Sequence, residues 1–123
     1  MILAVIPARS GPKYVKIRQM INTTSLVKKL KPLNPEKIII FGSYAKNKAT
    51  SRNSDIDILI IKQTKKKPVD RIAEVLPLIW GHIPNIEPQI FTPDEFSLAV
   101  KQNRFFITEE ILKYGKTIYE KTQ

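Results

Sequence analysis

The chain has 123 residues, of which 42% are apolar and 26% charged, a size that predicts one domain with a single modest core. No apolar run reaches the roughly 20 residues of a transmembrane helix, and no charged segment precedes the apolar start, so neither a membrane protein nor a secreted one is expected. Cysteine is absent and His82 is the single histidine. Disulfides, thiolate metal sites and a cysteine nucleophile are thereby excluded, and a cytoplasmic location is expected.

Positive charge is concentrated in the N-terminal part of the chain. Residues 1–54 contain eleven lysines and arginines and one acid, Glu36, whereas residues 55–123 contain ten charges of each sign. This asymmetry favours an anionic partner such as a nucleotide, a nucleic acid or an acidic protein, and a solubilising surface is the alternative. Nucleic acid is the least favoured partner, because the sequence has no aromatic stacking platform or recognition-helix signature.

Periodicity and breakers predict alternating helices and strands. Residues 1–12 are an apolar stretch that ends in Ser10–Gly11–Pro12, which we treat as an N-terminal extension. Thr23–Thr24–Ser25 offers a cap for the second part of the first helical segment. The expected helical segments are 13–31, 69–79, 93–102 and 105–113, and residues 44–48 are expected to form a helical turn or short helix. The expected strands are 37–41, 55–61, 86–91 and 117–119.

This order of elements predicts an α/β (α+β) domain in which a small mixed sheet is flanked by helices. Phe41 and Trp80 are expected in the core, and Pro88 indicates a strand edge or a bulge. Phe105 and Phe106 are expected to pack, and exposure of either would indicate a partner surface. The helix over 69–79 is expected to bury one face made of Ile72, Val75, Leu76 and Ile79.

A polar segment between the first two expected strands carries the first candidate residues. Gly42 and Ser43 follow a strand and precede an expected helix start, so the Ser43 hydroxyl and the free N–H groups beyond it can hold a phosphate. An ordinary turn is the alternative. Lys46, Lys48 and Arg52 either meet phosphate oxygens or form a solvated loop.

Acidic residues open the second and third expected strands. Asp55 and Asp57 are two positions apart, so both carboxylates project from one side of the strand while isoleucines occupy the other. Carboxylates this close repel unless a cation or a proton neutralises them, and they suit Mg²⁺. If the third strand lies beside the second, Glu87 joins the pair, and three acids fit a two-metal site for phosphoryl chemistry. Solvated strand ends are the alternative.

These residues resemble the minimal nucleotidyltransferase (MNT) family of the DNA polymerase β superfamily. The resemblance lies in Gly42–Ser43 followed by Asp55-Ile-Asp57 at nearly the family spacing, and it extends through residues 86–96 and 111–119. It implies a single domain of the nucleotidyltransferase fold over residues 1–123. It also implies that Gly42 and Ser43 bind the triphosphate, and that Asp55, Asp57 and Glu87 are the catalytic residues and hold two Mg²⁺ ions. Glu87 stands where the family usually has aspartate.

The resemblance also implies a reaction and a partner. An acceptor oxygen would attack the α-phosphorus of ATP or another NTP, so that a nucleoside monophosphate (AMP from ATP) is transferred and pyrophosphate leaves. Many members of the family are encoded beside a HEPN-domain protein and act as its antitoxin. A HEPN-type protein partner in a toxin–antitoxin system is therefore expected, and a homodimer is a further expectation.

The sequence departs from the family pattern in three ways, of which those at Asn47 and Glu87 favour an alternative function. The gap between Ser43 and Asp55 is about one residue longer than usual, Asn47 stands where glycine is common, and Glu87 is longer than aspartate and precedes proline. The alternative is a catalytically weak antitoxin, a binding module that neutralises its partner by contact.

Overall fold

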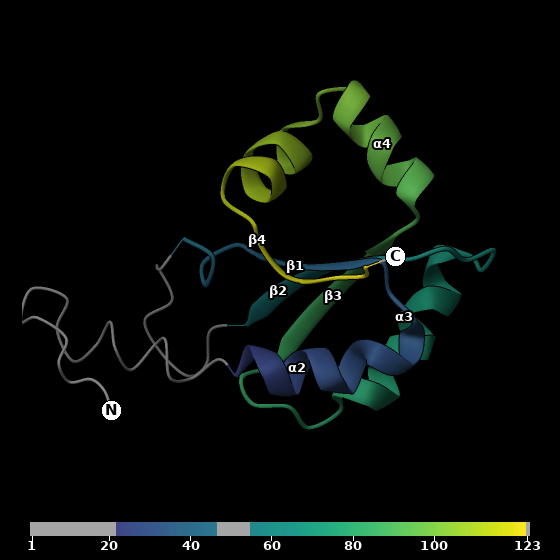
Figure 1. Ribbon diagram of the computed structural model, residues 1–123, viewed down its shortest axis with the longest axis vertical. Helices are drawn as coiled ribbons and strands as arrows, with labels where there is room; N and C mark the ends of the chain where they lie inside the picture. The colour runs from purple at the N-terminus through teal and green to yellow at the C-terminus, as the bar shows by residue number, and fades with distance from the viewer. Residues whose placement is uncertain (1–21, 47–54, 123) are drawn as a thin grey trace, which may run out of the picture.

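A four-stranded sheet forms the centre of the computed structural model, which describes residues 22–46 and 55–122 (Figure 1). The strands are β1 (Lys37–Phe41), β2 (Ile56–Ile61), β3 (Ile86–Phe91) and β4 (Lys116–Glu120), in the order β3-β2-β1-β4. Strand β1 pairs antiparallel with both β2 and β4, whereas β2 and β3 are parallel. The expected mixed sheet with helices is confirmed, and β3, which contains Pro88, is an edge strand as predicted.

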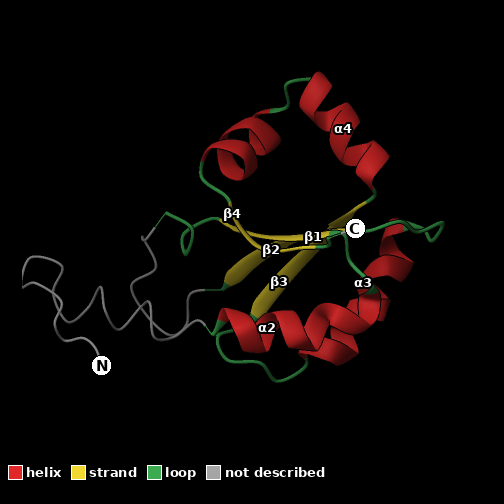
Figure 2. Cartoon of the chain, viewed as in Figure 1, coloured by secondary structure: helices red, strands yellow, loops and turns green. Residues whose placement is uncertain are grey.

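Helices cover both faces of this sheet (Figures 1 and 2). One face carries α2 (Thr23–Leu30), which continues into the short helix η1 (Lys31–Leu33), and α3 (Pro68–Ile79). The other face carries α4 (Pro93–Lys101) and η2 (Phe106–Lys113). The helices before β1 and after β2 thus lie on one face, and the two helices between β3 and β4 lie on the other.

Successive side chains of β2 point to opposite faces of the sheet, so the strand contributes to the hydrophobic cores on both faces. Ile56, Ile58 and Ile60 are fully buried in the core under α2 and α3. Leu59 and Ile61 are buried in the second core, under α4 and η2. Because both faces of a central strand are covered, the strand is apolar at nearly every position, which is why the isoleucine-rich run was a strong signal in the sequence.

The helix starts follow the expected capping chemistry with one correction. The N-cap of α2 is Asn22, whose side chain accepts a hydrogen bond from the Ser25 backbone N–H at 2.9 Å, so the prediction of a cap within residues 23–25 is wrong by one position. The predicted start of α4 is confirmed as a capping box between Thr92 and Glu95, with Pro93 in the first turn.

The apolar face predicted for α3 is confirmed in part. Val75 and Ile79 are buried and Ile72 packs against them, but Leu76 is exposed, because the buried stripe runs through residues 71, 75 and 79. The prediction that Trp80 belongs to the core is wrong, since the helix ends at Ile79 and the indole is 85% exposed.

The last helix differs in type from the expectation. Residues 106–113 form a π-helix, a form that is often found at functional sites, rather than an α-helix. Phe106 packs edge-to-face on Phe41, with ring centroids 5.2 Å apart, whereas Phe105 is 73% exposed. The core position of Phe41 is confirmed, and the packing of Phe105 is not.

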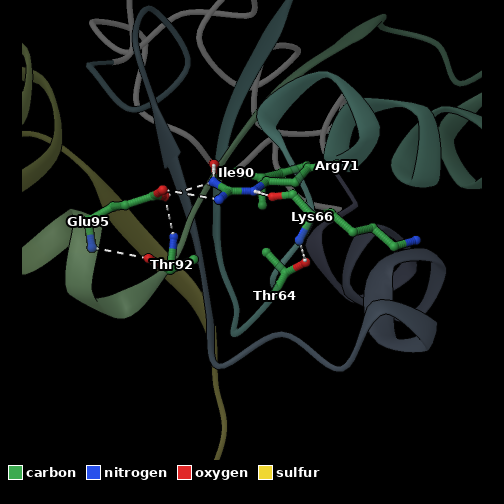
Figure 3. Close-up of polar contacts among 6 residues, drawn as sticks. All are labelled: Thr64, Lys66, Arg71, Ile90, Thr92 and Glu95. Atoms are coloured by element: carbon green, nitrogen blue, oxygen red, sulfur yellow. Dashed lines mark hydrogen bonds and ion pairs between the residues drawn. The ribbon is translucent and has the colours of Figure 1, made fainter.

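A buried arginine joins the two helical layers at the β3 edge (Figure 3). Arg71 of α3 makes two hydrogen bonds to the carboxylate of Glu95 in α4, at 2.7 and 3.0 Å. Its guanidinium also donates to the backbone carbonyls of Lys66 and Ile90. The charge is therefore buried only with full hydrogen bonding, which is the condition under which a buried ion is tolerated.

Candidate functional site

The turn that follows β1 is the first part of the candidate site. Gly42 has a φ of +75°, a conformation that glycine adopts at little cost, and Ser43 beside it is half-buried. A Cβ atom at position 42 would overlap the carboxylate of Asp57, so only glycine lets these two segments lie this close. The missing side chain thus leaves room for the carboxylate at the end of β1.

The prediction of a helical turn or short helix over residues 44–48 is confirmed as a turn in the described part of the segment. Residues 42–46 form a turn, which is closed by a hydrogen bond from the Lys46 N–H to the Gly42 carbonyl at 3.1 Å. Residues 47–54, including Asn47, Lys48 and Arg52, lie outside the described residues. A phosphate at this turn would be held by the Ser43 hydroxyl and by backbone N–H groups.

The acidic residues come from neighbouring strands, as the sequence predicted. Asp55 directly precedes β2, and Asp57 is its second residue and stands opposite Phe41 of β1. On the other side, the parallel register pairs Asp57 with Glu87 of β3. Asp57 and Glu87 belong to the alternation that leads to Leu59 and Phe91, so both lie on the α4–η2 face of the sheet.

The local electrostatics are those of crowded carboxylates. The pKa of Asp57 is raised above its ordinary value, first by burial and then by repulsion from Glu87, Asp55 and Glu110. Burial also raises the pKa of the Tyr44 phenol, with a second contribution from Asp55. A cation placed among these acids would relieve the repulsion, and hard oxygen ligands suit a divalent ion.

The carboxylate oxygens of Asp55, Asp57 and Glu87 are suitable ligands for a divalent cation, but in the described residues they are not already arranged as a complete metal site. Within residues 22–46 and 55–122, no group of three or more acidic or histidine side chains is arranged to hold a metal ion. Mg²⁺ typically binds through one or two carboxylates together with substrate phosphates. The room that Gly42 leaves is taken by the Asp57 carboxylate itself, which therefore lies against the turn after β1.

Two residues beside the acids were not singled out as a pair from the sequence. The ammonium of Lys46 lies 2.7 Å from a carboxylate oxygen of Glu110 in η2, and it also lies 5.3 Å from the centre of the Tyr114 ring. Lys46 was recognised as a possible phosphate contact, but Glu110 was not. The two positions are 64 residues apart, and nothing in their local spacing predicts the pairing.

Comparison with known families identifies the class of the protein. The family profile described as "Nucleotidyltransferase domain" matches residues 23–115, most of the chain. The chain therefore belongs to the nucleotidyltransferase domain family, which confirms the resemblance seen in the sequence. A search of curated proteins finds no match.

Solved structures share the fold. A chain from a toxin–antitoxin complex with AMP-PNP superposes with a TM-score of 0.51 at 19% identity, covering 84% of this chain and 77% of that chain. A chain from a mutant form of the toxin–antitoxin pair MntA–HpeT gives a TM-score of 0.53 at 18% identity, covering 84% and 76%. At these identities the similarity establishes the fold.

No helix in the described residues is both long and apolar enough to cross a membrane.

Proposed function

We propose that the protein is an antitoxin nucleotidyltransferase of the cytoplasm, which moves AMP from ATP to a HEPN-type toxin. The observation that carries the proposal is the parallel register that pairs Asp57 with Glu87, together with the close approach of the Asp57 carboxylate to Gly42. Family membership supports the transferase class. The toxin–antitoxin neighbours, one of them with AMP-PNP, support the setting and the nucleotide.

Each candidate residue has a place in the proposed site, within a single domain over residues 1–123. Ser43 and the backbone of the turn from Gly42 to Lys46 bind the triphosphate. Asp55 and Asp57 hold Mg²⁺, and Glu87 completes the metal site on the side where the acceptor binds. Two Mg²⁺ ions, when bound, supply charge neutralisation for the attacking and leaving oxygens.

The reaction follows from this placement. A hydroxyl oxygen of the acceptor forms a bond to the α-phosphorus of ATP, and the bond from that phosphorus to the bridging oxygen breaks. Pyrophosphate leaves with the electron pair, and the acceptor proton is lost to water or to a nearby carboxylate. The chain itself contributes positioning and charge, which account for most of the catalysis in phosphoryl transfer.

The decisive experiment measures label transfer to a HEPN-type partner protein. We expect wild-type protein to transfer label from α-labelled ATP in a Mg²⁺-dependent way, and Asp55→Ala and Asp57→Ala variants to lose more than about 99% of the rate. γ-Labelled ATP is the control, because its label leaves with pyrophosphate. Label from γ-labelled ATP on the partner, or full activity of both variants, would contradict the proposal.

The second candidate function is neutralisation of a partner protein by contact, without catalysis. The exposure of Glu87, the proline that follows it and the absence of a ready-made three-ligand metal group in the described part of the chain favour it. A wild-type protein that neutralises its partner without Mg²⁺-dependent label, and an Asp57→Ala variant that neutralises it equally well, would establish the binding module. A second copy of the chain as the bound partner would appear as a dimer in light scattering.

A further inference from the structure

An apolar groove lies beside β3, the edge strand of the sheet, and the proposed function does not yet use it. The groove has a volume of about 340 Å³ and lies between the start of α3 and the middle of α4. The apolar residues that line it are Pro68, Ile90, Phe91, Leu98 and Ala99. Leu98 is 55% exposed, and Phe105, which follows the lining residue Arg104, is 73% exposed. Exposed apolar residues at a groove are typical of a surface that binds a partner.

The charged residues of the groove carry a net positive charge. Arg71 and Glu95 neutralise each other through two hydrogen bonds, at 2.7 and 3.0 Å, and Figure 3 shows this pair at the β3 edge. Arg104, the third charged residue of the lining, is exposed, and its side chain makes no hydrogen bond or ion pair within the described part of the chain. The groove therefore combines an apolar lining with a guanidinium that can pair with a carboxylate.

The edge of the sheet at this groove is closed to a further strand. Pro88 in β3 has no backbone N–H, and the Ile90 carbonyl already accepts a hydrogen bond from Arg71 at 3.3 Å. A bound segment therefore cannot add to β3 as a continuous strand, which is a common mode of binding at an open edge. It has to be recognised by its side chains, through the apolar lining and through Arg104.

The charge of the whole chain decides between two kinds of protein occupant. A second copy would bring a further formal charge of +10 to a groove that is itself positive, which opposes self-association. An acidic segment of another protein would instead complement both Arg104 and the net charge of the chain. Ile90 follows Glu87 by three residues, about 10 Å along β3, so a protein bound in the groove would lie beside the proposed acceptor side of the site.

We propose that this groove receives an acidic segment of the partner protein, whose apolar side chains fill the groove while a carboxylate pairs with Arg104. The inference rests on the partner protein of the proposed function and gives the surface by which that partner is held. It does not depend on catalysis, because the same contacts would hold the partner for nucleotide transfer or for neutralisation by contact. Leu98 and Arg104 are thus recognition residues, and neither belongs to the proposed nucleotide site.

The test measures the dissociation constant for the purified HEPN-type partner protein by calorimetry. We expect Leu98→Gln and Arg104→Gln each to weaken partner binding about tenfold, Arg104→Glu to weaken it further, and Arg104→Lys to retain part of the affinity. Added salt should weaken partner binding by wild-type protein more than by Arg104→Gln, because that variant lacks the charge pair. The affinity for AMP-PNP in Mg²⁺ should stay within about twofold of wild type in all four variants.

A matched control lies outside the groove. Trp80 is 85% exposed and does not line the groove, so Trp80→Gln should change partner affinity less than about twofold. Thermal unfolding of each variant shows whether it folds. Both groove positions are exposed, and Arg104→Gln serves if Leu98→Gln lowers stability.

The outcomes separate this inference from the proposed function. Unchanged partner affinity in the Leu98 and Arg104 variants, or a loss no larger than that of Trp80→Gln, overturns the groove as the binding surface and leaves the transferase standing. Partner binding that depends on the groove without any label transfer retains the inference and overturns the transferase. A dimer of the chain in light scattering that Leu98→Gln dissociates would make a second copy the occupant and overturn the inference. Failure of wild-type protein to bind the partner overturns both.

Discussion

Strand β2 presents different kinds of side chain to the two faces of the sheet. Toward α2 and α3, strand β2 presents only isoleucines, and all three are fully buried. Toward α4 and η2, the same strand begins with Asp57 and becomes apolar only at Leu59 and Ile61. The proposed site thus lies where the apolar side chains of the second face end, and the continuous apolar core of the first face supports it from below.

The largest expected loss of stability comes from a cavity in the core between the sheet and helices α2 and α3. Ile58→Ala truncates a fully buried side chain of the central strand β2 and leaves a cavity. The free energy of unfolding should therefore fall by about 3 kcal/mol. Urea unfolding measures this, with Leu112→Ala at an exposed position of η2 as the control, expected to change stability by under about 0.5 kcal/mol. Equal effects of the two substitutions would show that this face is not the main support.

Filling the space at the end of β1 should harm both the fold and the site. Gly42→Ala places a side chain at a positive φ and against the Asp57 carboxylate, so we expect a loss of about 1–2 kcal/mol of stability and displacement of Asp57. Gly81→Ala is the matched control, since Gly81 has a similar φ of +77° but nothing within 4 Å of its added Cβ. If both variants bind AMP-PNP as wild type does, the close approach at Gly42 has no functional role.

The ion pair that joins the two layers should make stability depend on pH. Hydrogen bonding from Arg71 holds the pKa of Glu95 below its ordinary value, so the pair stabilises the fold above the pKa of the unfolded chain. This contribution is lost as pH falls through the lower pKa of the folded state. Since the Glu95 side chain is partly exposed, we expect Glu95→Gln to cost about 1 kcal/mol at pH 7. Urea unfolding from pH 7 to pH 3 should show the difference from wild type shrinking, and a constant difference would contradict this assignment.

The smallest expected effect on stability is a gain, caused by removal of the Asp57 charge. The raised pKa of Asp57 means that its charged form is disfavoured in the fold, so it lowers stability as pH rises above the ordinary aspartate pKa. Asp57→Asn should therefore stabilise the metal-free protein at pH 7, by less than about 1 kcal/mol because solvent screens the half-buried group. Thermal unfolding in chelator measures the change, and destabilisation by this substitution would mean that the carboxylate is needed for the fold.

The sequence predicted the elements that rest on local patterns. The isoleucine run of β2, the capping residues of α4 and the edge position marked by Pro88 are local signals, and all three are confirmed. The neighbouring positions of Asp57 and Glu87 depended on the condition that the third expected strand lies beside the second, which the register of β2 and β3 bears out.

Other features depend on tertiary context that no local pattern contains. Trp80 is large and apolar, but the end of α3 turns it outward. The pairing of Lys46 with Glu110 joins segments far apart in the chain. The buried residues of η2, Ile107 and Ile111, are four positions apart, a spacing that an ordinary α-helix shows as well, so the sequence does not distinguish the two helix types. The catalytic and metal-binding roles of Asp55, Asp57 and Glu87 remain predictions that the following measurement addresses.

The most direct test is the thermal stabilisation of the protein by Mg²⁺ and AMP-PNP together, compared with each alone. A ligand that binds only the folded state raises the unfolding temperature, by an amount that grows with the logarithm of its concentration relative to its dissociation constant. The account predicts a rise for wild-type protein that needs both ligands, and loss of that rise in Asp57→Asn. An equal rise in the variant, or a rise with AMP-PNP that does not need Mg²⁺, would contradict a metal-dependent nucleotide site at the end of β1.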